Sequence, residues 1–164
     1  MKYELIELEE FSQNRVRIYS VLPQNSDKAL FDLFLDENTP NHKDEVDDIY
    51  LRLESISEET GLREHFYKSG EGNWGDEVCA LYDKPNSHLR LYFIKVNSCI
   101  IILGGGGHKR KEIRAYQEDE KLNAEAGLMK EISKAVFDRI TNKEITIDQR
   151  NNSLIGNLIF NEKE

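Results

Sequence analysis

The sequence lacks any apolar run close to the ~20 residues that a membrane-spanning helix needs. Its first residues also lack the apolar stretch and small-residue cleavage site of a secretory signal, so we expect a cytoplasmic protein without a membrane partner. Cysteine is scarce, and Cys79 and Cys99 both lie in apolar runs typical of strands. This placement favours reduced thiols in a protein core over the alternative, a disulfide.

Positive charge is scarce as well: 22 Lys or Arg stand against 31 Asp or Glu, a formal net charge of −9. Such a surface would repel a polyanion over most of its area, which excludes general coating of nucleic acid. The length of 164 residues fits a single domain, residues 1–164, with a core of its own. We see no internal repeat, low-complexity tract or linker in the sequence.

Hydrophobic alternation and turn residues predict strands over residues 3–8, 15–22, 78–82, 89–96 and 99–103, and a C-terminal hairpin joining residues 144–148 to 153–160. Helical spacing predicts two N-terminal helices, one after the cap residues 25–27 and one over 43–59, with a break at Pro40 between them. A third helix is predicted over 121–139. The expected fold class is α+β: a mostly antiparallel sheet with two N-terminal helices and one C-terminal helix packed on it, plus an extra N-terminal strand and the hairpin.

Residues 84–116 form a basic segment in this acidic chain. They hold seven Lys or Arg against one acid, a local balance of +6, while the rest of the chain sums to −15. Two strand-like runs lead into four consecutive glycines, residues 104–107, and then into His108, Lys109, Arg110 and Lys111. A positive segment beside flexible glycines is typical of an anion-binding site, with phosphate as the first candidate.

The spacing around the glycines does not match the common nucleotide-binding loops. In a Walker-type loop a glycine directly precedes the lysine and Ser or Thr follows it, whereas Lys109 lies between a histidine and an arginine. A dinucleotide fingerprint starting at Gly104 would need a glycine at position 109. Two interpretations remain: the backbone at Gly105 and Gly106 lets a ligand approach closely, or the glycines form a bulge that ends a strand without any ligand.

The side chains of this segment suggest roles in binding and cleaving a phosphate ester. Arginine gives bidentate contacts and lysine a point charge, so the cations from residue 109 to 114 could hold several phosphates. His108 has a reference pKa of ~6.5, which suits proton transfer near neutral pH, and a lysine crowded by cations could also act as a base. Arg90 alternates with Leu89, and it points either into a groove of the sheet with Tyr92 or along the surface.

Metal and cofactor sites are not indicated by the sequence. The four histidines and two cysteines show no metal-ligand spacing, so we predict no zinc site and no cofactor. No Ser-His-Asp or Cys-His signature of nucleophilic catalysis is visible either.

The order of elements, with the segments LRLYFI and CIIILGGGGHK, resembles the RelE/ParE superfamily of bacterial toxins, above all its HigB-like or phage Gp49-like branch, over about residues 15–140. The resemblance implies a RelE-like domain that acts as the toxin of a type II toxin–antitoxin pair, with an antitoxin of the helix-turn-helix type as partner. Many members cut mRNA on the ribosome without a metal, whereas the ParE branch inhibits DNA gyrase. The function that the resemblance implies is therefore a metal-independent mRNA endoribonuclease.

The resemblance also assigns roles to individual residues. Arg90 matches the strand arginine that contacts the scissile phosphate, and Lys109 and Arg110 match basic residues after the last strand. In this chemistry the ribose 2′-OH attacks the adjacent phosphate while a base takes its proton and cations stabilise the transition state. We therefore predict that Arg90 and Arg110 stabilise charge, that Lys109 or His108 transfers the proton, and that all converge on one glycine-lined hollow. The expected RNA-binding residues are Lys95, Gly105, Gly106, Lys111, Arg114 and Tyr116, the last of which matches a C-terminal aromatic of the family.

Residues 26–60 are strongly acidic, with eleven acids against three Lys or Arg. Either these acids are the solvated faces of amphipathic helices, or they bind a partner. The alternative function is therefore a non-catalytic protein of the same fold that binds a protein partner, which would be the antitoxin or, as in the ParE branch, gyrase.

Overall fold

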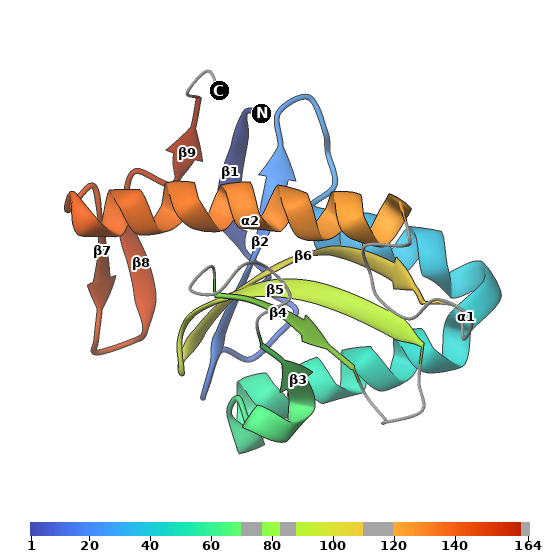
Figure 1. Ribbon diagram of the computed structural model, residues 1–164. Helices are drawn as coiled ribbons and strands as arrows, with labels where there is room; N and C mark the ends of the chain where they lie inside the picture. The colour runs from blue at the N-terminus through green and yellow to red at the C-terminus, as the bar shows by residue number, and fades with distance from the viewer. Residues whose placement is uncertain (70–76, 83–87, 110–119, 162–164) are drawn as a thin grey trace.

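The computed structural model describes residues 1–69, 77–82, 88–109 and 120–161 (Figure 1). Within these ranges the protein has two α-helices, a mixed seven-stranded sheet and a separate two-stranded sheet. The helices are α1 (Leu30–Ser55) and α2 (Glu120–Thr141), and a short π-helical turn (Ile56–Thr60) follows α1. The strands are β1 (Tyr3–Glu7), β2 (Arg17–Pro23), β3 (Tyr67–Lys68), β4 (Val78–Leu81), β5 (Leu89–Asn97), β6 (Ile100–His108), β7 (Ile145–Asp148), β8 (Ser153–Gly156) and β9 (Ile159–Phe160).

The large sheet has the strand order β3-β4-β5-β6-β2-β1-β9. Neighbouring strands pair antiparallel except β2 and β6, which run parallel from Arg17 opposite Ile100 to Ser20 opposite Leu103. A parallel pair needs a long crossover, and here the chain between β2 and β6 passes through α1 and the strands β3 to β5. The predicted sheet is wrong in this respect, because the observed sheet is mixed and larger than expected.

The sheet separates two apolar clusters, one covered by α1 and the other by α2 (Figure 1). Strand β5 shows how alternation divides them: Leu89, Leu91 and Phe93 are buried in the α1 cluster, whereas Tyr92 and Ile94 are buried in the α2 cluster. Because successive strand residues point to opposite faces, this pattern assigns each side chain of β5 to one face. We call the two sides of the sheet the α1 face and the α2 face.

The glycine run lies inside β6 and contains a β-bulge. Phe93 pairs with Leu103, but Leu91 pairs with Gly106, so two residues of β6 stand opposite one residue of β5. A bulge adds one residue to a strand and shifts every later pairing by one position. The side chains at the end of β6 therefore point to the opposite face of the sheet from the one that they would have in an unbroken ladder.

The same glycines let α2 lie close to the sheet. A Cβ atom on Gly104 would overlap the thioether of Met129, and one on Gly105 would overlap the carboxylate of Glu125. Both neighbours belong to α2, and Gly104 and Gly105 are buried beneath this helix. The structure thus places a helix, and not an open hollow, over these two glycines.

The prediction of three helices, two of them N-terminal, is wrong for the part of the chain that the structure describes. α1 continues through Pro40, and its backbone leaves helical geometry at His42 (φ −139°, ψ 39°). Proline in a helix interior removes a backbone hydrogen bond and clashes with the carbonyl four residues earlier, which kinks a helix. The two parts remain one element because Phe31 and Phe34 before the kink and Ile49 after it are buried in the same cluster.

The predicted C-terminal hairpin ends earlier than expected. β7 and β8 pair from Ile145 opposite Gly156 to Asp148 opposite Ser153. Gly156 has a φ of 123°, which side-chain-bearing residues rarely adopt, and the chain turns away there. β9 then pairs with β1 at the edge of the large sheet.

Neither cysteine forms a disulfide: Cys79 is buried and Cys99 is half-buried. Neither helix in the described ranges is long and apolar enough to cross a membrane.

Candidate functional site

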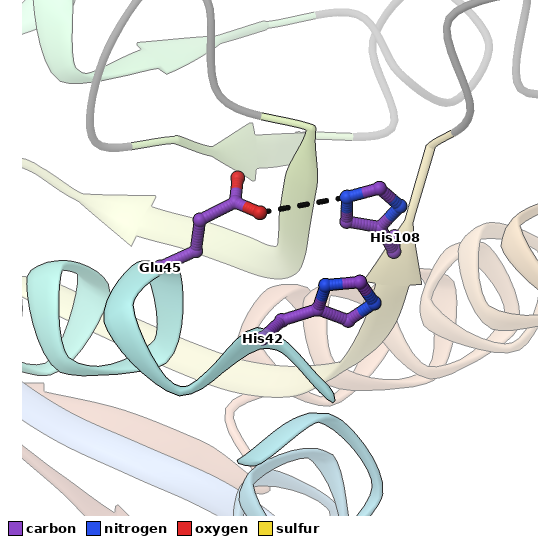
Figure 2. A group of neighbouring side chains, drawn as sticks. All are labelled: His42, Glu45 and His108. Carbon is purple, nitrogen blue, oxygen red and sulfur yellow. Dashed lines mark ion pairs between the residues drawn. The ribbon is translucent and has the colours of Figure 1, made fainter. Parts of the chain in front are cut away.

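Four polar side chains from distant parts of the chain meet where β6 ends. His42 and Glu45 belong to α1, His108 is the last residue of β6, and His88 precedes β5. Figure 2 shows the side chains of His42, Glu45 and His108 pointing toward one another. The imidazole rings of His42 and His108 lie parallel, with centroids 3.9 Å apart and an interplanar angle of 2°. The ring of His88 lies 5.3 Å from that of His108, and we call these four residues the histidine cluster.

The kink in α1 and the bulge in β6 position these side chains. Glu45 lies in the helical part of α1 after the kink, and His42 stands three residues earlier at the kink itself, where the backbone is not helical. His108 pairs with Leu89, which is buried on the α1 face, so the side chain of His108 leaves the sheet on that face too. The cluster therefore lies between the sheet and the kinked part of α1.

Glu45 is held by the backbone at the start of β5. Its Oε1 accepts hydrogen bonds from the amides of His88, at 2.7 Å, and Leu89, at 3.1 Å. Its other oxygen, Oε2, lies 3.4 Å from Nε2 of His108. The two amides thus fix the carboxylate so that one oxygen faces the histidine ring.

Burial and charge decide the protonation of this pair. The side chains of His108 and Glu45 are 28% and 27% exposed. Burial lowers the pKa of His108, the neighbouring His42 lowers it further, and Glu45 opposes both effects without outweighing them. Burial alone would raise the pKa of Glu45, but the two backbone amides and the nearby histidines together lower it. At neutral pH the pair is therefore a neutral imidazole beside a carboxylate.

This arrangement suits two kinds of chemistry. A neutral imidazole can accept a proton, and an adjacent carboxylate can orient the ring and stabilise the imidazolium that forms. Two imidazoles and a carboxylate are also a donor set for transition-metal ions, and the candidate ligand atoms of His42, Glu45 and His108 lie within 4.8 Å of one another.

Arg90 does not share a face with His108. It pairs with Gly107, and it alternates with Leu89, so its side chain lies on the α2 face. Its guanidinium carbon is 5.4 Å from the ring centroid of Tyr82, and its Nη1 donates to the carbonyl of Leu89 at 3.0 Å. The structure therefore separates the two residues that were predicted to converge, one on each side of the sheet.

The predicted RNA-binding residues are scattered. Lys95 pairs with Ile101 and lies six positions along β5 from Leu89, the residue that pairs with His108. At the usual rise of a strand, Lys95 is roughly 20 Å from Leu89. Its Nζ lies 3.4 Å from the hydroxyl of Tyr67. Gly105 and Gly106 are buried in β6, where a Cβ on Gly106 would overlap the carbonyl of Arg90 in the neighbouring strand. None of these three residues adjoins the histidine cluster.

The backbone of Lys109, one of the predicted cations, lies beside the cluster. Lys109 directly follows His108, it is half-exposed, and its amide donates to the carbonyl of His88 at 2.7 Å. The remaining predicted residues, Arg110, Lys111, Arg114 and Tyr116, lie outside the described residues.

Sequence reasoning found His108 but missed His42, Glu45 and His88. The available signal was the pair His42 and Glu45 at a spacing of three in a helical segment, which the search for metal-ligand spacing among histidines and cysteines did not consider. Their partner His108 comes from a distant strand, so only the fold could join the set.

Neither a scan against protein-family models nor searches of curated proteins and of solved structures found a match to this chain. We therefore infer a function from the residues of the cluster and their geometry.

Proposed function

We propose that this protein is the toxin of a type II toxin–antitoxin pair and that it cleaves mRNA through acid–base chemistry, without a metal. The observation that carries the proposal is the pair Glu45 and His108, a neutral imidazole beside an oriented carboxylate. The order of the strands β2, β4, β5 and β6 supports it, because the RelE/ParE resemblance depends on this strand order, although one kinked helix, α1, stands where the resemblance has two helices. The proposal includes action in the cytoplasm and a helix-turn-helix antitoxin as partner.

The proposed reaction uses the ribose 2′-OH as the nucleophile. His108 takes the proton of this hydroxyl, its oxygen attacks the adjacent phosphorus, and the bond to the 5′-oxygen breaks. A proton returns to the departing 5′-oxygen from His42, whose ring stacks on that of His108, or from Lys109, the next residue of the chain. The products are a 2′,3′-cyclic phosphate and a 5′-hydroxyl. Glu45 orients the ring of His108 and stabilises its protonated form.

Charge stabilisation in this proposal comes first from Lys109, the cation next to the cluster. Arg90 lies on the α2 face, so we assign it to a neighbouring phosphate of an RNA strand that passes over the ends of β5 and β6. This revises the role that the resemblance implied, in which Arg90 contacts the scissile phosphate itself.

The proposal is tested by incubating the full chain with RNA in the presence of EDTA. We expect cleavage that leaves 2′,3′-cyclic phosphate ends and that falls by about 10²- to 10⁴-fold in His108→Gln. His65→Gln is the matched control, because His65 is exposed and lies outside the cluster. Cleavage of RNA whose 2′-OH groups are replaced by hydrogen, or equal activity of His108→Gln, would contradict the mechanism.

A cellular assay tests the toxin role separately. Induced expression of the wild-type chain should arrest growth, and His108→Gln should relieve the arrest. Harmless expression of the wild-type chain, with mRNA left intact, would remove the nuclease proposal.

A second candidate function is binding of a protein partner, and the surface of α1 favours it. Leu51 is 60% exposed, and three acids of the same helix, Asp47, Asp48 and Glu54, lie within one turn of it. An exposed apolar side chain surrounded by acids fits a partner that offers an apolar residue among cations. Leu51→Asp should weaken binding of a co-expressed antitoxin by more than about tenfold while RNA cleavage by the free protein is unchanged. Unchanged antitoxin affinity would exclude this surface.

A further inference from the structure

We infer that His42, Glu45 and His108 form a binding site for a divalent transition-metal ion, with Zn²⁺ as the best-matched ion. The three side chains offer two imidazole nitrogens and one carboxylate oxygen, and these candidate ligand atoms lie within 4.8 Å of one another. Figure 2 shows the three side chains close together between α1 and the end of β6. The sequence could indicate only His42 and Glu45, because the third ligand, His108, comes from a separate element.

The distances require a small closure around the ion. In a tetrahedral zinc site with bonds of about 2.1 Å, neighbouring ligand atoms are about 3.4 Å apart. Oε2 of Glu45 and Nε2 of His108 already have this separation, at 3.4 Å. The third ligand must move inward on the order of 1 Å, from the upper limit of 4.8 Å to the zinc geometry.

His42 supplies this movement. Its ring lies parallel to that of His108, so the in-plane lone pairs of the two rings do not converge as they stand. A rotation about the side-chain bonds of His42 turns its nitrogen toward the space between Glu45 and His108. His42 is half-buried and sits at the kink of α1, where its backbone is not held in helical geometry.

The surroundings of Glu45 match those of a metal-binding carboxylate. Its Oε1 accepts two backbone hydrogen bonds, from His88 and Leu89, which leave Oε2 directed at His108. Hydrogen-bonded partners of this kind orient metal ligands and increase affinity. The negative charge of the carboxylate also favours a cation in a half-buried site.

The donor set decides the class of ion. Imidazole ligands suit Zn²⁺, Co²⁺ and Ni²⁺, whereas Mg²⁺ and Ca²⁺ prefer sites built from oxygen. Three protein ligands leave a fourth position of a tetrahedral site for water or for another small ligand.

The consequence for activity rests on the proposed function. A zinc ion bound to Nε2 of His108 takes the place of the hydrogen that faces Glu45 and leaves the remaining ring proton on Nδ1, so the ring can no longer accept the proton of the 2′-OH. Zinc should therefore inhibit RNA cleavage by the full chain, and EDTA should restore it.

Zinc binding itself is tested without any reference to RNA. The full chain is freed of metal with EDTA, exchanged into buffer and titrated with Zn²⁺ against a chromophoric chelator. We expect one zinc ion per chain in the wild type. In His108→Gln and in Glu45→Gln we expect a zinc affinity lower by more than about 100-fold, because losing only a residue that hydrogen-bonds to a metal ligand already costs about 10- to 100-fold. His65→Gln, at an exposed histidine away from the cluster, should bind zinc like the wild type. Equal zinc affinity in His108→Gln, Glu45→Gln and the wild type would overturn the inference, as would no binding to the wild type.

A second measurement uses only the wild-type chain, so it does not depend on how the variants fold. Co²⁺ in place of Zn²⁺ should give the intense visible absorption of a four- or five-coordinate site with nitrogen ligands. The weak spectrum of six-coordinate Co²⁺ would overturn the site.

Failure of the metal site and failure of the proposed nuclease are distinguishable. If His108→Gln loses zinc binding and the wild-type chain cleaves no RNA in EDTA, the metal site is supported and the nuclease is rejected. Cleavage that needs zinc would keep the metal site but contradict metal-independent catalysis.

Discussion

The rings of His42 and His108 stack in parallel at 3.9 Å, although one belongs to a helix and the other to the end of a strand. The ring of His42 beside His108 disfavours the protonation of His108, because it would place two positive charges against each other. The carboxylate of Glu45, whose oxygen lies 3.4 Å from His108, acts in the opposite direction. The pKa of His108 is therefore a direct measure of whether these three groups meet in solution.

We expect His42→Gln to raise the pKa of His108 and Glu45→Gln to lower it further. The first change removes a positive neighbour and the second removes the stabilising carboxylate, while burial, the largest cause of the lowered pKa, remains. An NMR titration of the imidazole protons in metal-free protein measures both shifts, with His65→Gln as the control. Identical pKa values of His108 in His42→Gln and in the wild type would show that the rings do not stack in solution.

The lowered pKa of His108 also makes stability depend on pH. The folded state holds this pKa below its unfolded value of ~6.5, so the unfolded chain binds the proton more readily as the pH falls. The contribution to the free energy of unfolding is therefore complete above about pH 6.5 and is lost as the pH falls through the folded pKa. Urea unfolding between about pH 8 and pH 5 should show a shallower decline for His108→Gln than for the wild type. Equal slopes would mean that His108 titrates alike in both states.

Local periodicity in the sequence was enough to place most strands and the long C-terminal helix. Residues 121–139 carry an apolar stripe, and the structure extends this helix only to Glu120–Thr141. The break expected at Pro40 was wrong, because α1 continues past the proline with a kink. Apolar side chains on both sides of the kink are buried in one cluster, and this packing outweighs the local effect of the proline. The parallel pairing of β2 with β6 could not be read from a single sequence, because no local pattern states which distant strands become neighbours.

The predicted convergence of Arg90 and His108 failed for a more specific reason, the bulge in β6. Without it, continuing the ladder from Phe93 opposite Leu103 would place His108 opposite His88, on the same face as Arg90. The extra residue pairs His108 with Leu89 instead and moves it to the α1 face. A bulge was one interpretation of the glycines in the sequence. The sequence did not show, however, that the bulge adds one residue to β6, and this shift decides which residues His108 contacts.

We expect Arg90→Ala to weaken RNA binding more than the chemical step. Arg90 lies on the face opposite His108, so it can contact the RNA backbone but not the scissile phosphate held at His108. Cleavage kinetics should show KM raised by about tenfold with kcat changed much less, since a contact made equally in the ground and transition states affects binding alone. Lys109→Ala should lower kcat instead. A large loss of kcat in Arg90→Ala would place the scissile phosphate on the α2 face.

We expect Gly104→Ala to destabilise the fold by about 1–3 kcal/mol, because its new Cβ would overlap the thioether of Met129. Urea unfolding measures this change, and Met129→Ala in the same chain should relieve part of it by removing the obstructing side chain. Gly127→Ala is the matched control in α2, where a Cβ would meet no atom within 4 Å. This control should raise stability by about 0.5–1 kcal/mol, the usual preference of a helix for alanine over glycine. If Gly104→Ala were as harmless as Gly127→Ala, α2 would not lie against the glycine run.

Pro40→Ala tests whether the kink of α1 is needed to place His42 in the histidine cluster. Alanine restores the backbone hydrogen bond that proline lacks and removes the clash of its ring, which together cost about 3 kcal/mol in a helix interior. We therefore expect the free energy of unfolding to rise, by at most that amount, in urea denaturation. A straighter helix would at the same time move His42, two residues later, away from His108.

The same variant should therefore lose zinc affinity and RNA cleavage, each by more than about tenfold, while it gains stability. Thr39→Ala is the matched control: Thr39 is exposed beside the proline, and the change removes a methyl group and a hydroxyl that donates to the carbonyl of Leu35 at 2.6 Å. This control keeps Pro40 and should retain zinc binding. A Pro40→Ala protein that is more stable and still binds zinc like the wild type would show that His42 reaches its partners without the kink. Higher stability together with weaker zinc binding in Pro40→Ala would instead show that Pro40 lowers the stability of the helix and places His42 beside His108.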